Sequence, residues 1–292
     1  MSSAPPPEVG PGAAVPFGRI AVLGLGVIGG SLARALRSAV PDVRLAGWSP
    51  DEREGRAALE AGALTRVGRS WAETVADAEL VILATPLEAT LRMLGPVACT
   101  APRAVVSDVA SLKAPVAEVA RAEGIAGRWV GAHPMAGSER SGFGASRADL
   151  FRGARVWLTA APEAGARVRS VAALWEAVGG EPREAGAEDH DRRMALVSHL
   201  PQMLANLLAD HLASAAVPVD ELGPGGRDAT RLAGSDPAMW SDLLAHAPPE
   251  LPRALREVGA EVAALARRIE EGEIDPVRAM MARTRAWKEG AR

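Results

Sequence analysis

The stretch "RIAVLGLGVIGGSLARALRSA", residues 19–39, decides the fold. It opens with a short apolar run typical of a buried strand and continues with apolar residues at helical spacing. Between the two lies a G-x-G-x-x-G pattern, made by Gly24, Gly26 and Gly29. Such glycines allow a tight turn, close approach of a pyrophosphate to the backbone, and close packing of helix on strand. The stretch therefore predicts a dinucleotide-binding turn, in which Val27 and Ile28 also face the cofactor.

Apolar runs alternate with helix-like segments up to about residue 160. The runs after the first are residues 44–49, 80–86, 103–111, 128–134 and 154–159. Strands that alternate with helices imply right-handed crossovers and a parallel sheet covered on both faces. Beyond these runs the chain is rich in alanine and leucine, and no further strand is expected. We expect a disordered tail at 1–16, an α/β Rossmann-type nucleotide-binding domain at 17–162 and an all-α helical domain at 163–292.

Composition limits the partners of this chain of 292 residues. Its net charge of −3, without a basic block, argues against nucleic acid. Cys99 is the lone cysteine, which excludes an intramolecular disulfide and a cysteine-built metal cluster and favours a reducing cytoplasm. The N-terminal residues lack the features of a signal peptide, and no apolar run is long enough to cross a bilayer. We expect a cytoplasmic protein with no metal site and no membrane partner.

The residues after the second predicted strand bear on the choice of nucleotide. Dinucleotide-binding domains place an acidic residue about 20 residues past the glycine pattern, where it binds the ribose hydroxyls. Ser49 stands there in this chain, and Arg53 is close enough in sequence to meet a 2′-phosphate. This favours NADP+, or relaxed specificity, by a small margin. Asp51 or Glu52 would instead serve NAD+.

Further loops follow the carboxyl ends of the predicted strands, where open α/β sheets bind their ligands. Thr85 and Pro86 lie in one such loop and are expected beside the cofactor. Ser111 and His133 lie in two others, at the nicotinamide end of the cleft. Histidine is the natural base for removing an alcohol proton as hydride leaves the same carbon, because its pKa of roughly 6.5 keeps it largely neutral near pH 7. A structural histidine is the alternative.

Two polar clusters mark the helical half. One helix face carries His199, Gln202, Asn206 and Asp210. Pro201 predicts a kink in that helix, and a polar outer stripe is the alternative to a site. In the second cluster Arg231 precedes Trp240 by nine residues. An arginine fork suits a carboxylate, whereas the alternative is a surface ion pair. For Lys113, a structural role at a helix start is expected.

Five segments together resemble the prephenate/arogenate dehydrogenase family of tyrosine biosynthesis. In chain order they are "GLGVIGGSLARAL", "SDVASLK", "GAHPMAGSERSG", "SHLPQ" and "RDATRLAGSDPAMW". The family joins a nucleotide-binding domain to a helical domain that forms a dimer. Its members oxidatively decarboxylate prephenate to 4-hydroxyphenylpyruvate, or arogenate to tyrosine, with hydride transfer to NAD+ or NADP+. The resemblance implies a small-molecule substrate and a homodimer formed through the helical domain.

The resemblance also implies roles for single residues. His133 matches the family's catalytic histidine, and Ser111 matches the serine near the nicotinamide and the substrate hydroxyl. Arg231 matches the arginine that binds a substrate carboxylate. Further positions in or around the substrate cleft are matched by Glu139, His199, Gln202 and Trp240. Some prephenate-specific relatives have a histidine at the place of Gln202, and the loop before Arg231 lacks a frequent aromatic residue, so arogenate stays open as the substrate.

Three alternative functions share part of this pattern. Arogenate dehydrogenase is the nearest rival. A β-hydroxyacid dehydrogenase also joins a Rossmann domain to helices, but it would need a lysine in the helical domain, and Lys288 is poorly placed for that role. A non-catalytic NAD(P)-binding sensor is disfavoured because His133, Ser111 and Arg231 are all present.

Overall fold

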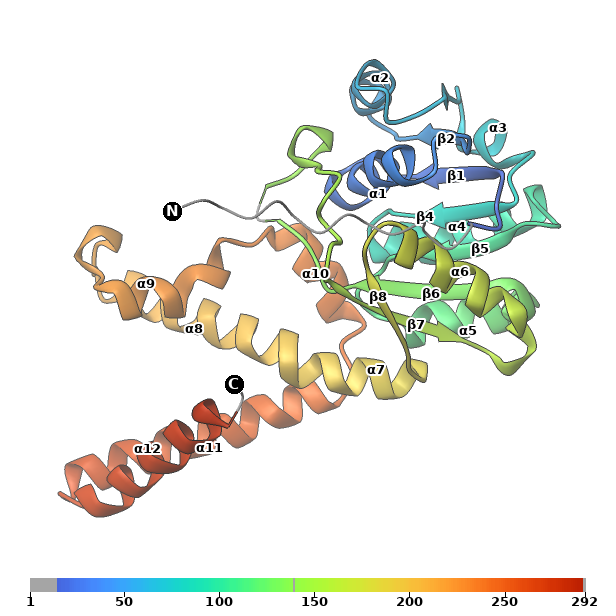
Figure 1. Ribbon diagram of the computed structural model, residues 1–292. Coiled ribbons are helices and arrows are strands. Elements are labelled where there is room, and N and C mark those ends of the chain that lie inside the picture. The colour runs from blue at the N-terminus through green and yellow to red at the C-terminus, as the bar shows by residue number, and fades with distance from the viewer. Residues whose placement is uncertain (1–14, 139, 291–292) are drawn as a thin grey trace. The chain divides into compact units, whose positions relative to one another are not determined.

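The structure is a computed structural model that describes residues 15–138 and 140–290 (Figure 1). The chain forms two compact units. The first contains the described residues up to Asp191 together with Gly234–His246, and the second contains Arg192–Ala233 and the described residues from Ala247 onward. The first unit thus extends past the boundary at 162/163 that we expected. The tail expected at 1–16 lies almost wholly outside the described residues.

The first unit is built on one eight-stranded sheet. Its strands are β1 (Arg19–Leu23), β2 (Arg44–Trp48), β3 (Arg66–Val67), β4 (Leu80–Leu83), β5 (Val105–Asp108), β6 (Trp129–Pro134), β7 (Arg155–Ala160) and β8 (Glu181–Glu184). They lie in the order β3-β2-β1-β4-β5-β6-β7-β8, and every neighbouring pair is parallel except β6 and β7. The chain order reverses between β1 and β4, and the carboxyl ends of these strands form the crevice where such sheets bind ligands.

Helices cover both faces of this sheet (Figure 1). They are α1 (Val27–Ala39), α2 (Glu52–Glu60), α3 (Trp71–Val75), α4 (Leu87–Thr100), α5 (Ala114–Ala122) and α6 (Ala166–Ala177). Successive strand residues point to opposite faces, so a continuous apolar strand supplies two cores. In β1, Ile20 and Val22 join the cluster under α1 and α6, whereas Ala21 and Leu23 join the cluster under α4 and α5. The unbroken apolar runs of the sequence are therefore what a sheet buried on both faces requires.

The predicted apolar runs form β1, β2, β4, β5, β6 and β7, but two expectations about the sheet were wrong. The chain forms one more strand, β8, in the segment "EPRE", and β7 and β8 run antiparallel to the other strands. β8 lies at the edge of the sheet and is mostly exposed. It therefore carries no apolar alternation and tolerates Pro182, so the hydrophobic pattern could not reveal it.

The second unit is helical. Its helices are α8 (Leu200–Ser214), α9 (Pro224–Thr230), α11 (Glu250–Glu270) and α12 (Ile274–Glu289). α7 (Ala187–Met194) continues through a π-helical turn, Ala195–His199, directly into α8. Pro201 lies in the first turn of α8, directly after the π-helical turn, and π-helical turns are a common place for an irregularity in a helix. No helix among the described residues has the length and apolar character needed to cross a membrane.

Helix α10 (Pro237–Ala245) belongs to the first unit although it follows α9 in the chain. Asp236 caps it by accepting a hydrogen bond from the Ala238 N–H at 2.9 Å, and Pro237 lies in its first turn. An aspartate at the cap and a proline in the first turn are residues that these positions favour. Just after α10, Nε2 of His246 lies 2.5 Å from Oε1 of Glu88, which joins this segment to α4.

Candidate active site

The loop between β1 and α1 has the geometry of a nucleotide-binding turn. Gly24 has a φ of +93°, and a Cβ there would lie 2.3 Å from the carbonyl oxygen of Ala84. A Cβ at Gly29 would lie 1.9 Å from the carbonyl oxygen of Gly24, so the close packing of α1 on the loop requires glycine. A Cβ at Gly26 would meet nothing within 4 Å. Gly26 thus faces open space, where a pyrophosphate can approach the backbone.

The N-terminus of α1 suits a phosphate. Gly26 is its cap residue, and in this fully described helix no side chain caps the first turn and no acidic residue lies in it. The amides of Val27 and Ile28 and the positive end of the helix dipole therefore remain available to an anion. Thr85 stands in the neighbouring loop after β4, where its hydroxyl lies 2.9 Å from that of Thr90. Pro86 caps α4 and is exposed.

The end of β2 carries a carboxylate as well as a hydroxyl. Ser49 is buried, and its Oγ donates a hydrogen bond to Oε2 of Glu54 at 2.6 Å. Glu54 lies in the first turn of α2. Arg53 instead pairs with Asp51 at 3.0 Å, with a guanidinium side chain that is 89% exposed. This pairing lowers the pKa of Asp51, mainly through the hydrogen bond from the Arg53 side chain.

His133 lies near the end of β6 and contacts a second histidine that sequence analysis missed. Its Nδ1 is 2.9 Å from Nε2 of His190, and the rings meet edge to face. Nδ1 of His190 is in turn 2.7 Å from Oδ1 of Asp191. His190 and Asp191 lie on α7 and are buried, whereas His133 is half-buried. The sequence signal for His190 and Asp191 was a His-Asp dipeptide at the start of an amphipathic helix.

Asp191 is held at the N-terminus of α5. Its Oδ1 accepts the backbone N–H of Lys113 and its Oδ2 accepts that of Ala114, each at 2.8 Å. A carboxylate at a helix N-terminus satisfies amides that have no partner within the helix, and the helix dipole favours its charge. This contact fastens α7 to the loop that carries Ser111, which is half-buried two residues before Lys113.

Lys113 forms a buried ion pair with Asp108, the last residue of β5. Both side chains are fully buried. Burial lowers the pKa of the Lys113 ammonium, and the carboxylate of Asp108 acts in the opposite direction. Nζ of Lys113 also donates to the carbonyl oxygen of Ala132 at 2.8 Å, and Nε1 of Trp129 donates to Asp108 at 3.0 Å. The ion pair therefore fixes the strand that presents His133, which agrees with the structural role expected of Lys113.

The other predicted residues divide between the units. Trp240 lies on α10 in the first unit, partly buried against the apolar cluster under α4 and α5. His199, Gln202 and Arg231 lie in the second unit, where Arg231 is exposed. His199 and Gln202 are buried, so the polar-stripe alternative fails for them. Nε2 of Gln202 donates to the carbonyl oxygen of Leu232 at 2.7 Å.

The remaining predicted residue, Glu139, lies outside the described residues. Of the predicted set, the structure brings the three glycines together with Thr85, since a Cβ at Gly24 would also lie 3.2 Å from its methyl group. It joins Ser49 to Glu54 and His133 to His190, two partners that sequence analysis had not named.

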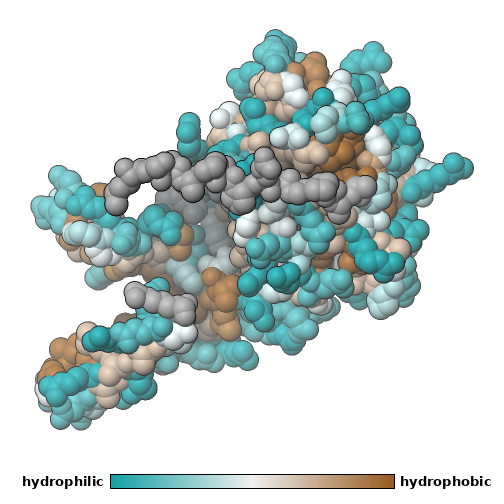
Figure 2. All heavy atoms as spheres, in the orientation of Figure 1, coloured by the Kyte–Doolittle hydropathy of each residue, from teal (hydrophilic) through white to brown (hydrophobic). Residues whose placement is uncertain are grey.

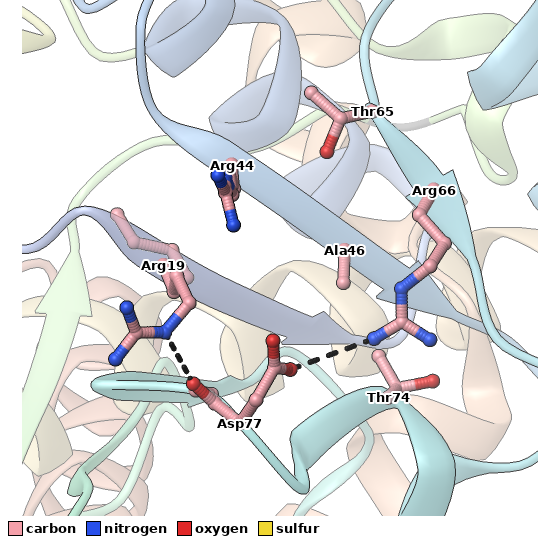
Figure 3. Close-up of a pocket in the computed structure, with 9 residues that line it drawn as sticks. Arg19, Arg44, Ala46, Thr65, Arg66, Thr74 and Asp77 are labelled. Atoms are coloured by element: carbon pink, nitrogen blue, oxygen red, sulfur yellow. Dashed lines mark hydrogen bonds and ion pairs between the residues drawn. The ribbon is translucent and has the colours of Figure 1, made fainter.

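A separate hollow lies at the opposite edge of the sheet (Figure 3). It is lined by residues at the starts of the first strands and near α3, including Arg19, Arg44, Thr65, Arg66, Thr74 and Asp77. Asp77 contacts two of these arginines. Its backbone carbonyl oxygen accepts a hydrogen bond from Arg19 Nε at 2.7 Å, and its carboxylate lies 3.7 Å from the Arg66 guanidinium. Because ligands of open parallel sheets bind at the carboxyl ends of the strands, this hollow is not the nucleotide site.

Comparison with known proteins agrees with this geometry. Residues 32–183 match the nucleotide-binding domain of prephenate dehydrogenase, and residues 186–283 match its dimerization domain. The chain belongs to the prephenate dehydrogenase family. Its first unit is the Rossmann-like nucleotide-binding domain of that family, and its second unit carries most of the helical dimerization domain.

Two relatives of the family illustrate the range of similarity. The chain is 35% identical to a prephenate dehydrogenase of Bacillus subtilis over 236 residues, which are 78% of this chain and 63% of the relative. It thus spans less than two thirds of that relative's length. It is 34% identical to a cyclohexadienyl dehydrogenase of Zymomonas mobilis over 252 residues, which are 81% of this chain and 83% of the relative.

Solved structures of the family share the fold. Prephenate dehydrogenase from A. aeolicus, in complex with hydroxyphenyl propionate and NAD+, matches with a TM-score of 0.83 at 26% identity, covering 94% of this chain and 98% of that one. Synechocystis arogenate dehydrogenase matches with a TM-score of 0.78 at 25% identity, covering 94% of this chain and 100% of that one.

Proposed function

We propose that the protein is a prephenate dehydrogenase of tyrosine biosynthesis, which oxidises and decarboxylates prephenate to 4-hydroxyphenylpyruvate. The observation that carries this proposal is the half-buried His133 at the carboxyl end of β6, on the sheet edge where the glycine turn opens. Membership of the family and the name of the Bacillus subtilis relative support it.

The chemistry fits these residues. Prephenate carries a ring alcohol and a ring carboxylate at opposite ends of a cyclohexadiene. The nicotinamide ring, when bound, supplies the hydride acceptor. His133 accepts the alcohol proton, for which a well-placed base contributes about 10²–10⁴ in rate, and Ser111 holds the same hydroxyl. The resulting ketone is conjugated through the ring, so loss of carbon dioxide and aromatisation follow and make the reaction effectively irreversible.

Substrate recognition in this proposal is assigned to the residues that match substrate-binding positions of the family. Arg231 binds a carboxylate of the substrate through its planar fork. The remaining substrate-recognition residues in this proposal are Glu139, His199, Gln202 and Trp240. Orientation of the hydroxyl carbon toward the nicotinamide and anchoring of a carboxylate are the main tasks, because the cofactor supplies the redox chemistry.

The preferred cofactor in this proposal is NAD+. The sequence favoured NADP+ by a small margin, because Ser49 has no charge. The carboxylate of Glu54, 2.6 Å from the Ser49 hydroxyl, supplies the missing negative charge from the next helix. It would repel a 2′-phosphate and accept hydrogen bonds from ribose hydroxyls. The NAD+ bound to the A. aeolicus relative supports the same choice.

A steady-state assay that crosses prephenate and arogenate with NAD+ and NADP+ tests the function. We expect the highest kcat/KM for prephenate with NAD+. His133→Asn should lower kcat by about 10²–10⁴ with a small effect on KM, because it removes the base and leaves the binding groups. Near-normal turnover of this variant would reject His133 as the base.

Arogenate dehydrogenase is the second candidate. The buried Gln202 favours it, because an amide stands where some prephenate-specific relatives have a histidine. The similarity to Synechocystis arogenate dehydrogenase supports the same reading. A higher kcat/KM for arogenate than for prephenate in the crossed assay would select this function.

We further propose that the protein is a homodimer through its second unit. Residues 186–283 match a dimerization domain, and α11 and α12 expose large apolar side chains there. Figure 2 shows apolar surface at the far end of the α11–α12 hairpin. Val262 is 60% exposed and Ile269 is 57% exposed. Large apolar side chains that are exposed together on one surface are typical of a protein–protein interface. Light scattering after gel filtration should give twice the mass of the chain, and a monomer at micromolar concentration would reject this.

A further inference from the structure

We propose that His190 is a positioning residue that fixes the tautomer of His133, so that Nε2 of His133 is the nitrogen that accepts the substrate proton. The juxtaposition behind this is the hydrogen-bonded series Asp191–His190–His133. The inference deepens the proposed function and rests on His133 being the base.

The first step assigns the hydrogen between Asp191 and His190. Both carboxylate oxygens of Asp191 already accept backbone N–H groups at 2.8 Å, from Lys113 and Ala114. An ionised carboxylate has no hydrogen to donate. Nδ1 of His190, 2.7 Å from Oδ1 of Asp191, therefore carries the hydrogen and donates it.

The second step carries this assignment to His133. The side chain of His190 is 0% exposed, and the proposal takes it as a neutral imidazole. A neutral imidazole has one donor and one acceptor nitrogen. With Nδ1 donating, Nε2 of His190 is an acceptor, so the hydrogen of the 2.9 Å contact belongs to Nδ1 of His133. Nε2 of His133 then carries a lone pair.

This tautomer is the one that proton transfer requires. In the reaction the O–H bond of the substrate alcohol breaks and an N–H bond forms at Nε2 of His133. The hydride leaves the same carbon for the nicotinamide ring. His133 becomes an imidazolium, and its Nδ1–H bond to His190 becomes charge-assisted and stronger. His190 touches neither substrate nor cofactor in this scheme. Asp191 orients His190 by accepting its Nδ1–H, as carboxylates orient metal-binding and catalytic histidines in other enzymes.

The frame around the histidines is fixed at both ends. On one side Asp191 is bonded to the first amides of α5. On the other side Lys113 donates to the carbonyl oxygen of Ala132, the residue before His133, at 2.8 Å. Lys113 also pairs with Asp108, the last residue of β5. A histidine pair held in this way keeps one orientation of the His133 ring.

Two variants of His190 test the proposal. His190→Phe keeps a ring but removes the acceptor, and we expect kcat to fall about 10²-fold, the typical cost of a misplaced reacting group. KM for prephenate and the NAD+ dissociation constant should stay within about twofold, because binding groups are untouched. His190→Gln offers an amide oxygen near the former Nε2 and should recover part of kcat. His211→Gln, at an exposed position of α8, is the matched control and should behave as wild type.

A spectroscopic measurement follows the tautomer directly. The chain has five histidines, so ¹⁵N-histidine labelling gives a small set of ring signals, and His133→Asn identifies the pair that belongs to His133. We expect a protonated Nδ1 and an unprotonated Nε2 in the wild type, and a mixture of tautomers in His190→Phe. A protonated Nε2 in the wild type, or normal kcat in His190→Phe, would overturn the positioning role. Normal turnover of His133→Asn would instead overturn the proposed function itself.

Discussion

Replacing Lys113 by methionine tests how far the buried ion pair stabilises the nucleotide-binding domain. Methionine keeps the volume of the lysine stem but leaves the Asp108 carboxylate without its cation at a site where both side chains are fully buried. Removing one partner of a buried pair costs about 3–5 kcal/mol. Asp108 keeps its hydrogen bonds from Trp129 Nε1 and the Ala110 N–H, each at 3.0 Å, so we expect the lower end of this range.

A loss of about 3 kcal/mol corresponds to a fall in Tm of about 6–12 °C for a unit of this size. Thermal and urea unfolding, followed by circular dichroism, measure both quantities. Lys288→Met is the matched control, because Lys288 is the second lysine of the chain and is exposed on α12. Its stability should match that of wild type.

The double variant Asp108→Asn/Lys113→Met decides whether the unpaired charge causes the loss. Asparagine removes the buried charge while it can still accept the bond from Trp129, so the double variant should regain most of the lost stability. The reasoning is refuted if Lys113→Met costs less than about 0.5 kcal/mol, the range of ordinary surface substitutions, or if the double variant is no more stable than the single one.

Three further predictions concern the nucleotide and substrate sites. Glu54→Gln should bring the dissociation constants of NAD+ and NADP+ closer together in a calorimetric titration, because it removes the charge beside Ser49; an unchanged ratio would count against its role. Gly26→Ala should leave Tm unchanged, since a Cβ there meets no atom within 4 Å, but should weaken nucleotide binding. Gly24→Ala should lower both Tm and the affinity for the nucleotide, because residue 24 has a φ of +93° and its Cβ would lie 2.3 Å from the carbonyl oxygen of Ala84. Arg231→Ala should mainly raise KM for prephenate, as expected when ground-state carboxylate binding is lost, and an unchanged KM would exclude that role.

Local patterns predicted much of the nucleotide-binding unit. Three local features are each recognisable within a few residues: a fully apolar strand, a glycine turn and an amphipathic helix. This is because strand and helix geometry set which positions are buried, and apolar residues then recur in the sequence at those positions. The same reading placed His133 in the loop after a strand, and the structure places it as the second-to-last residue of β6. The edge strand β8 left no such record, since its exposed residues need no apolar alternation.

The ribose end of the cofactor site shows where local reading stops. Ser49 directly follows β2 as the sequence indicated, but its partner Glu54 lies in the first turn of α2. An acidic residue at that distance is ordinary in a solvent-exposed helix. Only the approach of α2 to the strand end brings its carboxylate to the hydroxyl and changes the expected nucleotide preference.

The sequence by itself determined the βα alternation, the glycine turn and the family to which the chain belongs, because these depend on residues that are neighbours in the chain. Only the tertiary structure decided which groups surround His133. His190 is 57 residues away in the chain, and the Asp191 carboxylate that holds it meets the Lys113 amide across 78 residues. Contacts of that range arise from the packing of α7 against α5 and β6, and a pattern of neighbouring residues carries no information about which distant side chains that packing brings within hydrogen-bond distance.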